Sequence, residues 1–118
     1  MRYVDGYVLP VPKKNLAAYR RMAKAGARLW KKHGALEYFE CVGDDLNVKW
    51  GVLTFLRLVK PRRGETVVFS FIVYKSRAHR DRVNAMVMKD PMMSKMPKTM
   101  PFDMKRMTMG GFKVLVEA

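Results

Sequence analysis

The sequence contains little cysteine, little acid and no long apolar run. Cys41 is the only cysteine among 118 residues, so no disulfide can form within the chain. No stretch approaches the length of a membrane span, and the first residues lack the apolar segment of a secretory signal. These absences argue against a disulfide-stabilised secreted domain. We expect a protein of the cytoplasm with no membrane partner.

Acidic residues are outnumbered by basic ones. Ten Asp and Glu stand against 24 Lys and Arg, which gives a formal net charge of +14 and a pI near 10.3. An excess of one sign attracts polyanions and has no bearing on the fold. By charge alone, nucleic acid, acidic lipid surfaces and anionic metabolites are all favoured as partners.

Motifs for metal, cofactor or nucleophile chemistry are also missing. The only histidines, His33 and His79, do not form a zinc set with Cys41, and no glycine-rich phosphate loop or nucleophile elbow occurs. Methionine is concentrated between Met86 and Met109. Thioethers bind copper(I), but adaptable packing of an irregular connection is the favoured interpretation. We expect no metal and no cofactor, and the sequence leaves open whether the protein is an enzyme.

Apolar content is high enough for one core. With 49% hydrophobic residues, the chain is expected to form a single domain over residues 1–118. Alternation predicts strands, and three- and four-residue apolar spacing predicts helices. The expected strands are 2–9, 35–42, 52–60, 66–74 and 106–117, and the expected helices are Lys13–His33 and Ser76 to about Met88.

The order of these elements predicts an α+β fold. Residues 52–60 and 66–74 should form an antiparallel hairpin around the turn at "PRRGE". The plan is a ferredoxin-like βαββαβ arrangement with an additional strand, in which two helices cover one face of an antiparallel sheet.

Both faces of the expected sheet are apolar. Val67, Phe69 and Phe71 alternate with Val68 and Ile72, where a solvated face would be polar. Two helices can cover one face only. A second copy of the chain is the simplest cover for the other face, so we expect a face-to-face homodimer. The alternative is a monomer whose second face is sheltered by the methionine-rich connection.

Three stretches carry a resemblance to a known family. "YVDGYV" at 3–8, "DPMM" at 90–93 and "MPFDMKRMTMGGF" at 100–112 resemble the YbaA-like family of small bacterial proteins of unknown function. The resemblance covers nearly the whole chain. It implies membership of the dimeric α/β-barrel superfamily, in which two ferredoxin-like sheets pack face to face. It implies no activity and no catalytic residues.

A polar cluster is expected between the two sheets. Asp5 lies in the first strand between Tyr3 and Tyr7, and a lone buried carboxylate needs a partner, for which Arg57 is the expected residue. Such a cluster predicts a cavity that binds, or turns over, a small anionic organic molecule. A purely structural ion pair is the alternative. The ligand-pocket candidates are Asp5, Tyr7, Glu40, Arg57, Ser70, Tyr74, Asp103 and Arg106.

Asp103 and Arg106 precede the closing strand. Asp103 can accept hydrogen bonds from nearby amides and brace the turn after Pro101. The functional alternative places Asp103 and Arg106 at the polar mouth of a ligand site.

The first helix is basic along one side. Arg20, Lys24, Arg28 and Lys32 follow one another at four-residue steps, and no acid occurs from Lys13 to Lys32. Arg77 and Arg80 would extend this surface on the second helix. Phosphate binding follows as an alternative function, a nucleic-acid-associated protein without sequence specificity. A third possibility is an interaction protein that binds no ligand.

Overall fold

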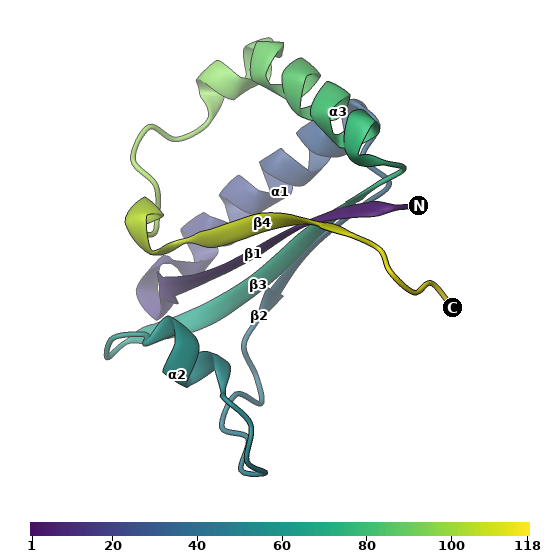
Figure 1. Cartoon of the computed structure of the whole chain (residues 1–118). Helices are drawn as coiled ribbons and strands as arrows, with labels where there is room; N and C mark the ends of the chain where they lie inside the picture. The colour runs from purple at the N-terminus through teal and green to yellow at the C-terminus, as the bar shows by residue number, and fades with distance from the viewer.

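The protein is built around one four-stranded antiparallel sheet (Figure 1). The computed structural model describes all residues 1–118, and the strand order is β2-β3-β1-β4. The strands are β1 (Tyr3–Pro12), β2 (Glu37–Val42), β3 (Glu65–Tyr74) and β4 (Thr108–Lys113). The helices are α1 (Leu16–Lys32), α2 (Phe55–Val59) and α3 (Arg77–Lys89), and 3₁₀ turns η1, η2 and η3 cover Lys13–Asn15, Pro91–Lys95 and Met104–Arg106. This is the expected α+β fold in βαββαβ order.

The expected additional strand is absent. Residues 52–60 instead form a loop and the short helix α2, whose first turn is capped by Thr54 Oγ1, 3.1 Å from the backbone N–H of Arg57. Lys60 ends α2 in the left-handed conformation, with φ of 53°. A short apolar run does not by itself distinguish a strand from a helix. The threonine cap decides in favour of the helix.

The two long helices agree closely with the sequence prediction. Gly34 follows α1 with φ of 112°, which suits glycine and terminates the helix. The side chain of Ser76 caps α3 by accepting from the N–H of His79. No helix has the length and apolar content that crossing a bilayer requires. The expected cytoplasmic location stays a prediction.

β1 continues through Pro10 and Pro12, beyond the end of the strand predicted at 2–9. β4 pairs with β1 only from Tyr3 to Val8, whereas β3 pairs as far as Pro12. Beyond Val8 the strand therefore has a neighbour on one side only. A proline lacks the backbone N–H and is tolerated at such an edge.

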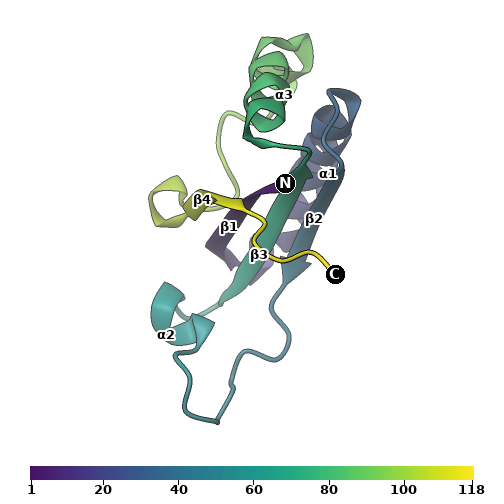
Figure 2. The same ribbon diagram turned by 45° about the vertical axis from the view of Figure 1, so that its right-hand side comes forward.

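The sheet has two faces of different chemistry, which we call the helix side and the open side. α1 and α3 lie together over the helix side, and Figure 2 shows the sheet with this layer against it. All five tyrosines belong to the helix side, four on strands and Tyr19 on α1. On the open side lie Phe39, Phe69, Phe71 and Phe112, according to the strand register.

The open side is exposed in the single chain. Phe39, Phe69 and Phe112 are 48%, 43% and 63% accessible, and α2 covers only one end of the face through Phe55 against Phe69. Sixteen strand positions share this face, and the only charged ones are Glu37 and Glu65, each the first residue of its strand; the others are Val4, Gly6, Val8, Pro10, Pro12, Phe39, Cys41, Val67, Phe69, Phe71, Val73, Thr108, Gly110 and Phe112. The predicted second apolar face is therefore present.

Candidate functional site

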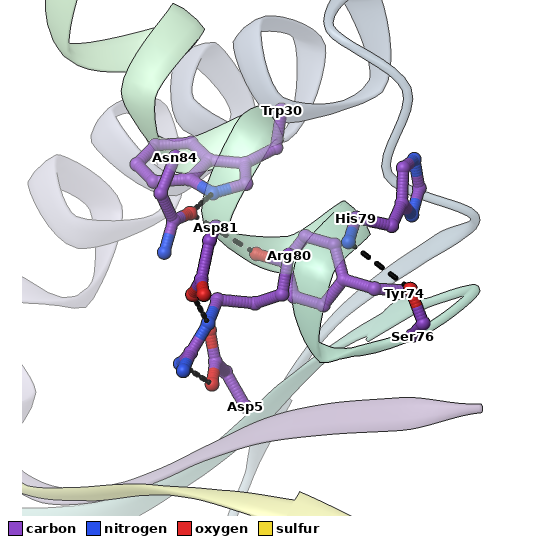
Figure 3. Close-up of polar contacts among 8 residues, drawn as sticks. All are labelled: Asp5, Trp30, Tyr74, Ser76, His79, Arg80, Asp81 and Asn84. Atoms are coloured by element: carbon purple, nitrogen blue, oxygen red, sulfur yellow. Dashed lines mark hydrogen bonds and ion pairs between the residues drawn. The ribbon is translucent and has the colours of Figure 1, made fainter. Parts of the chain in front are cut away.

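Asp5 lies on the helix side, which corrects its expected place between two sheets. It is 1% exposed, and Arg80 of α3 donates from Nη1 to Asp5 Oδ1 at 2.7 Å (Figure 3). Arg57, the expected partner, is instead an exposed residue of α2. Burial raises the pKa of Asp5 and outweighs the lowering effect of the Arg80 charge. The pair joins β1 to α3.

Further hydrogen bonds surround this ion pair. Asn84 Oδ1 accepts from Trp30 Nε1 at 3.0 Å and from the Tyr74 hydroxyl at 3.3 Å, which links α3 to α1 and β3 (Figure 3). The Arg80 guanidinium also lies 4.9 Å from the ring centroid of Tyr3, a cation–π distance. No buried side-chain nitrogen or oxygen is left without a partner. Such a fully satisfied network fixes the docking of α3 and offers little to a ligand.

Glu40 forms a second polar centre farther along the sheet. Tyr7, Ser70 and Glu40 are cross-strand neighbours on β1, β3 and β2. The two Glu40 oxygens accept from the hydroxyls of Tyr19 at 2.7 Å and Tyr38 at 2.9 Å. Helix α1 supplies Tyr19, so the carboxylate is held between the helix and the edge strand.

The tyrosines around Glu40 are poor acids. Burial and the charge of Glu40 raise the pKa of Tyr19 and Tyr38 far above the ordinary value of 10.0. Burial, together with the smaller effect of the Asp5 charge, raises the pKa of Tyr7 to about 12. The hydroxyls therefore remain protonated donors, and Glu40 is an oriented acceptor with lone pairs to spare.

A pocket of about 430 Å³ opens between α1 and β2 beside Glu40. Eight of its eleven lining residues are hydrophobic, and the other three are Arg20, Lys24 and Glu40. Glu40 is half-buried, whereas the two cations are exposed. The arrangement is a largely apolar site with an acceptor inside and positive charge toward solvent, and its size is typical of small-molecule sites.

Asp103 and Arg106 lie apart from both polar centres. Asp103 is exposed and accepts from the N–H of Lys105 at 3.0 Å, so it caps η3 as a turn brace would. Arg106 donates to Glu65 at 2.8 Å and to the Lys60 carbonyl at 3.2 Å. These contacts attach η3 to the chain on either side of the turn before β3.

The predicted basic surface is present on α1 but not across α3. Arg20, Lys24, Arg28 and Lys32 are exposed, as is Arg77. The Arg80 side chain, however, is turned inward to Asp5 and is only 18% exposed. Arg80 therefore does not extend the basic surface.

Sequence reasoning did not find four residues of the site: Tyr19, Tyr38, Trp30 and Asn84. Tyr38 and Glu40 are two residues apart on one strand, so alternation places them on one face and could have linked them. The partners on α1 and α3 depend on how the helices dock, and that depends on tertiary packing.

The fold and the pocket define a class of small α+β proteins with an antiparallel sheet and a helix-side cavity. The chain belongs to the family described as a protein of unknown function (DUF1428), whose model matches residues 2–104. The uncharacterized proteins YbaA of Escherichia coli strain K12 and of Shigella flexneri are each 45% identical over 118 residues, with 99% of both chains covered.

The chain also matches solved structures, among them a designed protein. The de novo designed protein Foldit4 matches with a TM-score of 0.46 and 14% identity, covering 99% of this chain and 100% of that one. A likeness at this level supports no inference about function. The family and its relatives likewise bring no activity to the site.

Proposed function

We propose that the protein binds a small, largely apolar organic anion in the pocket between α1 and β2. The observation that carries this proposal is the pocket itself, in which Glu40 is flanked by tyrosines and two cations face solvent. The ligand class agrees with the sequence-based expectation. Its location differs, because Asp5, Tyr7, Glu40, Ser70 and Tyr74 belong to the helix side of one chain, and the pocket lies beside Glu40.

The chemistry of the lining suggests how such a ligand would be oriented. A hydroxyl or N–H of the ligand would donate to Glu40, whose remaining lone pairs are not used by Tyr19 and Tyr38. An anionic group at the other end would meet Arg20 and Lys24. The apolar wall supplies the area that drives binding.

We also propose that the protein is a homodimer that pairs through its open sides. Two copies, each with a net charge of +14, repel one another at most contacts. The open side reduces this repulsion because its strand positions carry no cation, and its two acids are Glu37 and Glu65, of which Glu65 is paired with Arg106. A twofold contact of like faces would cover the exposed phenylalanines of both chains.

A fluorescent apolar anion tests the ligand proposal. Anilinonaphthalenesulfonate should bind with enhanced emission, and Ala27→Trp, which fills the pocket wall, should abolish that binding. Arg20→Gln with Lys24→Gln should weaken it roughly tenfold by removing the charged contacts.

Ala85→Trp is the matched control, because Ala85 is exposed on α3 and does not line the pocket. Its binding should equal that of the wild type. Binding in the pocket would be refuted if both tryptophan variants lost dye binding equally, or if Ala27→Trp bound the dye as the wild type does.

A further inference from the structure

The outer surface of α1 carries a second feature, a basic surface of which only Arg20 and Lys24 also line the ligand pocket. We define the basic face as the exposed residues Lys14, Arg20, Arg21, Lys24, Arg28 and Lys31 of η1 and α1. We infer that the basic face binds the phosphate backbone of double-stranded nucleic acid. This inference does not rest on the proposed ligand site.

The charge of the basic face is not compensated within the chain. Lys32 is the only cation of α1 in an ion pair, and its partner is Asp90. None of the six residues of the basic face pairs with a carboxylate, although the structure contains six ion pairs elsewhere. Like charges four residues apart on a helix repel one another. A bound polyanion would relieve that repulsion.

The shape of the basic face favours a linear polyanion. Arg20, Lys24 and Arg28 succeed one another at steps of about 6 Å along the helix axis. A phosphate backbone presents its charges in a similar linear array. A compact anion would use only one or two of these residues.

The buried side of α1 indicates which kind of polyanion the basic face binds. Tyr19, Ala23 and Leu29 are buried against the sheet, so the helix has no apolar side chains free to enter a bilayer. The aromatic residues of α1, Tyr19 and Trp30, pack against Phe102 and Tyr38, so the basic face itself has no ring to stack on unpaired bases. Sequence-independent contact with a duplex backbone is what remains.

Duplex binding measured against salt tests the inference. Fluorescence anisotropy with a short labelled DNA duplex of arbitrary sequence should show binding at about 50 mM salt and a steep loss as salt rises. The variant Lys14→Gln/Arg21→Gln/Arg28→Gln should bind roughly tenfold or more weakly, and its slope of log K against log salt should fall by about 3. This variant leaves Arg20 and Lys24 of the ligand pocket intact.

A control of equal charge separates the basic face from net charge alone. Lys49→Gln/Arg62→Gln/Arg63→Gln removes three exposed cations that do not belong to η1 or α1 and should retain most of the affinity. Equal weakening of both triple variants would overturn the inference, as would absence of binding by the wild type at about 50 mM salt. Vesicles of phosphatidylglycerol that bind with the same dependence on Lys14, Arg21 and Arg28 would overturn the choice of nucleic acid.

Discussion

At the scale of single residues, the helix side holds two carboxylates in different ways. Asp5 is almost fully buried and is neutralised by Arg80. Glu40 is half-buried and is held by two tyrosine hydroxyls that carry no charge. A buried ion pair stabilises little by itself, but loss of one partner is costly. Asp5 is thus a structural residue, and Glu40 is the carboxylate available to a ligand.

Replacement of Arg80 should reveal the cost of an unpaired Asp5. We expect Arg80→Met to lower the free energy of unfolding by about 3 kcal/mol at neutral pH, because a buried carboxylate loses its cation. Urea denaturation checks this value. Arg77→Met, at an exposed position on the same helix, should change stability by no more than about 0.5 kcal/mol.

The loss in Arg80→Met should depend on pH. Burial already raises the pKa of Asp5, and removal of the Arg80 charge raises it further. The deficit is therefore largest where Asp5 is ionised, and it shrinks as pH falls and Asp5 takes up a proton. A deficit that grew toward acid pH would contradict this assignment.

At the scale of elements, Asp90 joins the ends of α1 and α3. Its Oδ2 lies 2.8 Å from Lys32 Nζ and 2.7 Å from His33 Nε2, and its Oδ1 accepts from the N–H of Met92 at 2.8 Å. Asp90 therefore ends α3, caps η2 and holds the C-terminal end of α1. The sequence predicted only that a helix ends at about Met88, and it gave Asp90 no partner.

Asp90→Asn should remove the charge and keep the cap. Lys32, the Met92 amide and His33 hold the pKa of Asp90 well below its ordinary value of 3.8. A lowered pKa stabilises the fold above the ordinary value, and this contribution is lost as pH falls through the folded-state pKa. We expect the variant to have a lower Tm than the wild type near neutral pH. The difference between the two Tm values should become smaller in strong acid.

Thermal unfolding followed by circular dichroism measures this difference. Asp44→Asn, in the exposed loop after β2, is the matched control and should leave the Tm unchanged. If the Tm of Asp90→Asn were lower than that of the wild type by the same amount from neutral to acid pH, the effect would not come from the charge of Asp90.

At the scale of the whole molecule, the two sides of the sheet have opposite roles. The helix side contains the tyrosines, Asp5, Glu40 and the pocket, and the open side contains a row of phenylalanines. Phe55, Phe69, Phe71 and Phe39 are in successive ring contact along that row. In the proposed dimer the basic face of α1 would lie outermost, once on each chain.

A charge on the open side should separate the proposed dimer. We expect the wild type to sediment at twice 13.7 kDa and Phe69→Glu to sediment as a single chain, because the mutation buries two unpaired carboxylates at a twofold contact. Analytical ultracentrifugation gives both masses. Met88→Glu, at an exposed apolar position on α3, should remain dimeric. A wild-type mass of 13.7 kDa would contradict the dimer.

The sequence by itself determined the order of the main strands and helices, the end of α1, the start of α3 and the presence of two apolar sheet faces. Local rules suffice there, because Gly34 and Ser76 mark helix ends and alternation assigns Phe69 and Ile72 to opposite faces. The prediction of a strand at residues 52–60 was wrong. A short apolar run is compatible with a strand or a helix, and here the Thr54 cap stabilises a helical turn.

Only the tertiary structure decided which face received the helices and which residues became partners. Alternation groups Asp5 with Tyr3 and Tyr7 but does not say that α3 covers that group. The pairing of Asp5 with Arg80, 75 residues away, arises from helix docking. The same docking brings Tyr19 to Glu40 and so forms the pocket. Contacts between distant segments depend on packing against the sheet, which local patterns do not encode.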